Sequence, residues 1–413
     1  MTRSIDRRRF VQLSAGGLAV GLAGCLGGDD DDDENGDDDD GNGGESGGDE
    51  GLAYAFAPNQ ISIIDPAEGE VVDEITDGID DYSWGDPRIT TDLSQIFVIE
   101  DSQDQVVVID TESREITAEV GIGPDATHMY HPNDDEMWAH SDENGAFYVV
   151  ETDSPEDGDV RVVESGLDDE GHGKLLYHED FGSMGYATNV NDPGAPVIDL
   201  EDYERSEFID FTESDEIDAE EGTHYKAYAP ETGLAYFEYG DETVVVDTET
   251  NDIVDVLDLA GGMYLTPDEQ LLGVLDGDDV RFLDATSEDS EELGSVTVEG
   301  GPDALRYYDD DGTIYAFTAN TMNDEGAVID TDEFEILDTL AVGDIERPEG
   351  ARHLHRSGVA GDEYFLTPAD GDGFVAVVDM AEQEVAHQVD VEDGVDTIQY
   401  VGDSGVGYSG KIR

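Results

Sequence analysis

Basic side chains are scarce in this sequence. Its 413 residues include 17 Lys and Arg against 107 Asp and Glu, which gives a formal net charge of −90. A polyanion such as nucleic acid would be repelled by this surface, so nucleic acid is excluded as a partner. The acidic residues are spread over the whole chain, and molar salt, with a Debye length of about 3 Å, removes most of their mutual repulsion. We therefore expect a surface adapted to very high salt.

Cysteine occurs once, as Cys25, so the chain forms no internal disulfide. The sequence lacks Cys-x-x-Cys-His, which excludes a covalently attached c-type haem. Its one Gly-x-Ser-x-Gly, at residues 44–48, lies in an acidic, Gly- and Ser-rich stretch rather than between a strand and a helix, and a phosphate-binding glycine loop is lacking. Paired carboxylates are so frequent in this composition that they identify no hydrolytic site. We therefore predict a binding protein rather than an enzyme.

Long apolar runs are also lacking, because the uncharged stretch Leu13–Leu26 is too short for a comfortable membrane span. The preceding residues, Arg7-Arg8-Arg9-Phe10-Val11, resemble a twin-arginine (Tat) export signal, and Leu22-Ala23-Gly24-Cys25 resembles a lipobox. The resemblance to haloarchaeal Tat lipoproteins implies a signal peptide at residues 1–24. It also implies lipidation of Cys25 and anchorage to the outer face of the cytoplasmic membrane. Residues 25–51, rich in acids, Gly and Ser, are predicted to be a disordered linker.

A unit of about 44 residues repeats from Leu52 to the end of the chain. Its clearest element is a short run of β-branched and aromatic residues, usually closed by Asp and followed by a polar turn. Eight such runs occur: Ile61–Asp65, Val106–Asp110, Ala146–Val150, Pro196–Asp199, Thr243–Asp247, Val280–Asp284, Ala327–Asp330 and Val375–Asp379. Regularly spaced runs of this kind are typical of the third strands of propeller blades.

We therefore predict that residues 52–413 form an all-β, eight-bladed β-propeller with four-stranded blades. Seven blades are the alternative if the irregular stretch 168–221 forms no blade. The first blade lacks an innermost strand, and a strand near Asp396 has no blade after it. These two parts should complete one another and close the ring, which removes exposed strand edges.

The repeated strands and the Gly-Pro-Asp turns at 123–125 and 301–303 resemble the YVTN and cytochrome d1 type of propeller over nearly all of residues 52–413. This resemblance implies the fold. It implies little about function, because propellers carry many different activities.

Four histidines occupy the start of an innermost strand: His128, His172, His224 and His353. Their spacings of 44, 52 and 129 residues correspond to one, one and three repeats. Equivalent positions in a propeller lie on a circle around the channel, so these imidazoles should face one opening. Neutral imidazoles bind zinc and copper well, and carboxylates can join or orient them. The predicted metal site consists of His128, His172, His224, His353, His355 and Asp86.

As an exported propeller with histidines at its blade entrances, this chain resembles the AztD-type zinc metallochaperones. In those proteins, histidines and a carboxylate hold zinc in the central cavity. The resemblance implies a surface lipoprotein that binds zinc and delivers it to an ABC importer, with the importer's solute-binding protein as its partner.

Two alternatives remain open. The first is a propeller or oxidoreductase that binds a d1-type haem, in which His224 or His353 is an axial ligand. The cations that would meet the carboxylates of the macrocycle are Lys174, Lys226, Arg306, Arg352 and Arg356. The second alternative is a protein-interaction scaffold.

Overall fold

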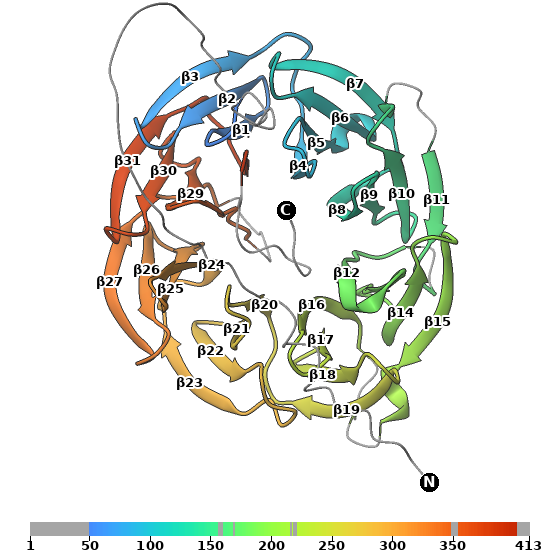
Figure 1. The fold of residues 1–413 in the computed structure, drawn as a ribbon. Helices are drawn as coiled ribbons and strands as arrows, with labels where there is room; N and C mark the ends of the chain where they lie inside the picture. The colour runs from blue at the N-terminus through green and yellow to red at the C-terminus, as the bar shows by residue number, and fades with distance from the viewer. Residues whose placement is uncertain are drawn as a thin grey trace, which may run out of the picture. The chain divides into compact units, whose positions relative to one another are not determined.

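The chain folds into eight antiparallel sheets of four strands, arranged as the blades of a ring (Figure 1). The computed structural model describes residues 49–155, 160–167, 170–214, 217, 221–347 and 354–402. The predicted signal peptide, Cys25, most of the linker and His353 lie outside these residues. No helix among the described residues is long and apolar enough to cross a membrane.

Blades 1 to 4 follow the predicted pattern, and blade 1 takes its inner strand from the end of the chain. Their strands, from the inside of the ring outward, are β32 (Thr397–Tyr400), β1 (Ala53–Ala57), β2 (Gln60–Asp65) and β3 (Glu70–Ile75); β4 (Trp84–Ile89), β5 (Gln95–Glu100), β6 (Gln105–Asp110) and β7 (Glu115–Gly121); β8 (Ala126–Asn133), β9 (Glu136–Ser141), β10 (Ala146–Glu151) and β11 (Val160–Glu164); β12 (Leu175–Tyr177), β13 (Met184–Ala187), β14 (Gly194–Asp199) and β15 (Glu204–Asp210).

Blades 5 to 8 repeat the same order along the chain. Their strands are β16 (Thr223–Ala229), β17 (Leu234–Tyr239), β18 (Glu242–Asp247) and β19 (Asp252–Leu257); β20 (Gly262–Leu265), β21 (Leu271–Asp276), β22 (Asp279–Asp284) and β23 (Glu292–Thr297); β24 (Pro302–Asp310), β25 (Thr313–Asn320), β26 (Glu325–Asp330) and β27 (Glu335–Ala341); β28 (Val359–Gly361), β29 (Tyr364–Ala369), β30 (Phe374–Asp379) and β31 (Glu384–Asp390). Short 3-10 helices occupy Asp101–Gln103 (η2), Glu179–Phe181 (η4) and Phe211–Glu213 (η5).

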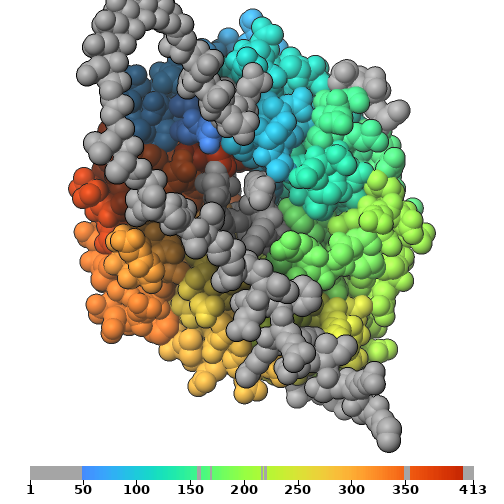
Figure 2. Space-filling view, viewed as in Figure 1, coloured from blue at the N-terminus to red at the C-terminus, as the bar shows by residue number. Residues whose placement is uncertain are grey.

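The prediction of eight blades is confirmed, and the seven-blade alternative is wrong because β12–β15 form a complete blade within the irregular stretch 168–221. Ring closure is confirmed as well, since β32 pairs antiparallel with β1 and places Ala53 opposite Tyr400. Figure 2 shows the blades following one another around the ring, with the first beside the last. Asp49 is buried and accepts hydrogen bonds from Arg114 and Tyr54.

The eight predicted runs are the third strands of the eight blades, and they are apolar because both of their faces are buried. One apolar cluster lies between each pair of neighbouring blades. The Asp that closes a run has a separate role. Asp65, for example, accepts hydrogen bonds through Oδ1 from the backbone N–H groups of Ala67 and Glu68 and so shapes the turn to the outer strand.

Candidate functional site

A cavity of about 420 Å³ lies where the eight inner strands meet, and every blade contributes to it. Its position on the common axis explains why residues far apart in sequence line it. They are Trp84, Gly85, Asp86, Arg88, Thr127, His128, Tyr130, His172, Lys174, His224, Tyr225, Lys226, Tyr264, Asp303, His355, Arg356, Ser357, Asp396 and Thr397. The structure therefore brings five of the six predicted site residues to one cavity.

Irregular pairing at the start of the inner strands directs side chains into this cavity. The register between β8 and β9 shifts next to His128, and the register between β16 and β17 shifts at His224. A similar shift between β4 and β5 includes Asp86. A β-bulge re-aims side chains and increases local twist, so each of these residues leaves the regular alternation of its strand. His172 lies just before β12, where its carbonyl accepts a hydrogen bond from the N–H of Val190.

Each of three imidazoles is held by a carboxylate at Nδ1. The distance from His128 Nδ1 to Asp86 Oδ2 is 2.8 Å, and that from His172 Nδ1 to Asp142 Oδ2 is 2.7 Å. His224 Nδ1 makes a longer contact of 3.2 Å with Glu238 Oε2. An ionised carboxylate only accepts hydrogen bonds, so each Nδ1 carries the proton. In a neutral ring, the lone pair is then on Nε2.

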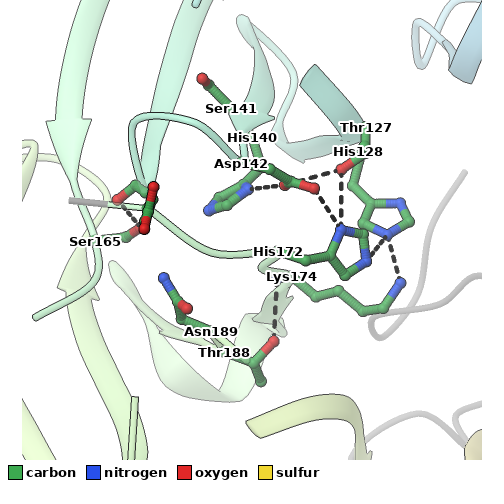
Figure 3. A network of polar contacts seen from close by, with 12 residues as sticks. Thr127, His128, His140, Ser141, Asp142, Ser165, His172, Lys174, Thr188 and Asn189 are labelled. Atoms are coloured by element: carbon green, nitrogen blue, oxygen red, sulfur yellow. Dashed lines mark hydrogen bonds and ion pairs between the residues drawn. The ribbon is translucent and has the colours of Figure 1, made fainter. Parts of the chain in front are cut away.

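The Nε2 atoms of His128 and His172 face one another at 3.0 Å (Figure 3). Burial and the charge of Lys174 lower the pKa of His128 well below that of an ordinary imidazole, so the ring is neutral at pH 7. His224 is the next ring, with its centroid 5.1 Å from that of His172, and burial lowers its pKa to about 4. His128 and His224 therefore present neutral imidazole nitrogens toward the cavity.

The charge of the cavity wall contrasts with that of the whole chain. The sequence has more than six acidic residues for each basic one. The wall has four basic residues, Arg88, Lys174, Lys226 and Arg356, against Asp86, Asp303 and Asp396. Desolvation by the surrounding protein raises the pKa of Asp396 to about 7, although its side chain is open to the channel. Burial lowers the pKa of Lys174 to about 8.

The remaining predicted residues have different outcomes. His355 lines the cavity but is 69% exposed at its side chain and pairs with Asp303 at 3.5 Å, which raises its pKa. His353 lies outside the described residues. Two carboxylates that orient imidazoles, Asp142 and Glu238, were missed by the sequence analysis. A functional carboxylate cannot be recognised by residue type in a chain with 107 acidic residues.

The three histidines do not yet form a complete ligand set. Within the part of the chain that the structure describes, no three His, Cys, Asp or Glu side chains are already grouped as metal ligands. His128 and His172 form a close pair, whereas His224 would have to turn toward them to share an ion.

Comparisons with known proteins give a likeness of fold. No family model matches this sequence, and no curated protein matches it. Among solved structures, the dihydro-haem d1 dehydrogenase NirN in complex with DHE has a TM-score of 0.66 at 14% identity, covering 86% of this chain and 76% of that protein. AztD from Citrobacter koseri has a TM-score of 0.60 at 12% identity, covering 88% and 98%. The computationally designed Ika8 protein has a TM-score of 0.57 at 12% identity, covering 79% and 95%. The chain is thus an eight-bladed propeller similar in structure to NirN and AztD.

Proposed function

We propose that this protein binds a transition metal, preferentially zinc, through Nε2 of His128 and His172, with His224 as a third ligand. The facing nitrogens of the first two rings carry the proposal. Two lone pairs 3.0 Å apart repel one another unless a proton or a cation lies next to both. The lowered pKa of His128 disfavours a proton, and the Lys174 ammonium makes its hydrogen bond to the His128 nitrogen. A metal ion that displaces this ammonium is therefore the occupant that can bind both nitrogens.

The donors suit zinc in type and spacing. Zinc binds imidazole nitrogen at about 2.0–2.1 Å, so two ligands of a tetrahedral site lie roughly 3.3 Å apart. The pair would have to open by only a few tenths of an ångström from 3.0 Å. Asp86, Asp142 and Glu238 already provide the outer contacts that orient histidine ligands in zinc sites.

Under this proposal the protein is a carrier, and it catalyses no reaction. It is exported through the Tat pathway, is anchored to the outer face of the cytoplasmic membrane through Cys25, and passes its metal to the solute-binding protein of an ABC importer. The structural likeness to AztD and the signal-like sequence of residues 1–25 support this role. The side chains of His172 and His224, 29% and 25% exposed, leave an exit for the metal.

Equilibrium dialysis tests the proposal. Chelator-treated protein is dialysed in molar KCl against zinc, with excess Mg²⁺ to saturate weak carboxylate sites. We expect about one zinc per chain, and its loss in a His128→Ala, His172→Ala double variant. His387→Ala, in outer strand β31, is the matched control and should retain zinc. Equal retention by the double variant and the control would contradict the proposal.

A second candidate is an anionic organic cofactor such as a d1-type haem. The basic side chains of the cavity wall favour it, as do the aromatic rings of Trp84, Tyr130, Tyr225 and Tyr264. The structural likeness to NirN points in the same direction. An absorption spectrum of protein purified from its native host separates the two candidates, because a Soret band would support the haem. Absence of both zinc and a chromophore would leave the interaction scaffold.

A further inference from the structure

An ammonium group lies beside the paired imidazoles. Lys174 Nζ is 2.6 Å from His128 Nε2, and the residue is only 5% exposed. An ammonium has donors only, so His128 Nε2 accepts this hydrogen bond. This direction agrees with the proton on Nδ1 that Asp86 requires. Figure 3 shows Lys174 reaching the same nitrogen that faces His172.

The local backbone places the lysine on the same side as His172. The two residues precede β12, and their carbonyls accept hydrogen bonds from the N–H groups of Val190 and Thr188. In such strand-like pairing, side chains two residues apart point to the same side. Lys174 is fixed there by pairing with Thr188, which accepts from the Lys174 N–H at 3.0 Å and donates to its carbonyl at 2.9 Å. Gly173 permits the close approach, because a Cβ there would lie 2.5 Å from the Thr188 carbonyl oxygen and 2.6 Å from His140 Nε2.

We propose that Lys174 is a resident cation that competes with the metal for Nε2 of His128. This inference rests on the proposed zinc-binding function and adds how the site releases its metal. A zinc ion at about 2.0–2.1 Å from Nε2 needs the lone pair that the ammonium now occupies. The two cations also repel one another, so loading displaces the lysine and release allows it to return.

A second group already holds the Lys174 ammonium. Its Nζ lies 5.3 Å from the ring centroid of Tyr225, whose face attracts cations, so an ammonium displaced from His128 keeps a favourable neighbour. Competition of this kind weakens binding and opens a path for fast release, which suits a protein that hands its metal on. Lys226 lies in the same cavity, but over the ring of Tyr130 at 5.7 Å, and provides the matched comparison.

The test measures zinc affinity and the rate of zinc loss to a chelator in full-length protein. Lys174→Met should bind zinc about tenfold or more tightly and release it about tenfold or more slowly. Lys174→Arg, which keeps the charge, and Lys226→Met should stay within about threefold of wild type. Lys174→Gln is a second uncharged variant in case the methionine variant folds poorly, as judged by circular dichroism.

The outcomes separate the two proposals. If wild type binds zinc but Lys174→Met and Lys174→Gln bind it equally or more weakly, the competition is overturned and the zinc site stands. If Lys226→Met tightens binding as much as Lys174→Met, a general charge effect replaces the specific contact, and the competition is again overturned. If no form binds zinc, both proposals fail.

Discussion

Two sectors of the ring use the same blade for different purposes. In blades 3 to 5, the entrances of the inner strands carry His128, His172 and His224, which face the cavity. In blade 6 the corresponding residue is Met263, which is 4% exposed and packs in the apolar cluster between blades 5 and 6. In blade 7 the corresponding residue is Arg306, which is buried, and its guanidinium carbon lies 5.3 Å from the ring centroid of Tyr264.

The difference shows which parts of the blade are constrained. The third strands are apolar in all eight blades because each lies between two interfaces. The entrance of the inner strand is free to vary, since it faces either the axis or a neighbouring blade. Function is therefore expected where a polar entrance residue meets a polar neighbour from the adjacent blade, as His128 meets Asp86.

The strongest test of this comparison exchanges one residue in each sector. We expect His172→Ala to weaken zinc binding about 100-fold or more, because it removes one of the two paired donors, with little loss of stability. Met263→Ala should leave zinc affinity unchanged and lower the free energy of unfolding by about 2–4 kcal/mol, because it opens a cavity in a buried cluster. Dialysis and denaturant unfolding measure both quantities. Similar zinc affinities in the two variants would remove the distinction between the sectors.

Asp142→Asn probes the outer contact within the histidine sector. Asp142 accepts from His172 Nδ1 at 2.7 Å and from His140 Nδ1 at 2.9 Å. Losing the carboxylate frees the orientation of His172, so zinc affinity should fall about 10- to 100-fold. Titration against a competing chelator measures this change. Wild-type affinity in the variant would show that Asp142 does not position the ligand.

Glu238→Gln should have a smaller effect. Its contact with His224 Nδ1 is 3.2 Å, and the same oxygen accepts from the Tyr225 N–H at 3.2 Å. A glutamine oxygen can keep either bond, so we expect zinc affinity to fall less than about tenfold. The same chelator titration checks it. A loss as large as that of Asp142→Asn would make His224 an equal partner of His172.

The smallest effect concerns pH and stability. Burial lowers the pKa values of His131, His140 and His224 below the ordinary value of 6.5, so folding keeps these rings neutral. The unfolded chain then takes up protons first, and their contribution to stability is complete above pH 6.5 and lost as the pH falls below it. Each such group contributes a slope of at most about 1.4 kcal/mol per pH unit.

The raised pKa of Asp396 makes the folded protein more stable as the pH falls, which opposes the effect of the histidines. The variant His140→Gln therefore isolates the contribution of one histidine. The unfolding free energy of the variant should depend less on pH between 7.5 and 5.5 than that of wild type. Denaturant unfolding in molar KCl at several pH values measures the difference. An equal or steeper pH dependence in the variant would contradict a neutral buried His140.

Much of the fold could be predicted from the sequence. The third strand of every blade is buried on both faces, so each blade contains a recognisable apolar run. The closing Asp is equally regular, since the turn after the third strand needs its side-chain oxygen, as Asp65 shows. Ring closure could be predicted because the first blade lacked an inner strand and the last strand lacked a blade. In the structure β32 pairs with β1 and completes that blade.

The site could be predicted only in part. Repeat-equivalent spacing identified His128, His172 and His224, and the structure places all three at one cavity. The predicted carboxylate, Asp86, holds His128. The carboxylates that hold His172 and His224, Asp142 and Glu238, were not predicted. Such partners depend on how strands and blades pack against one another, which a uniformly acidic sequence does not reveal.

X-ray absorption spectroscopy at the zinc edge of the zinc-loaded protein tests the central claim most directly. The account predicts a first shell with two or three imidazole nitrogens at about 2.0–2.1 Å, and the loss of this imidazole scattering in the His128→Ala, His172→Ala variant. A shell of oxygen atoms alone, unchanged in that variant, would place the metal on surface carboxylates and contradict the account.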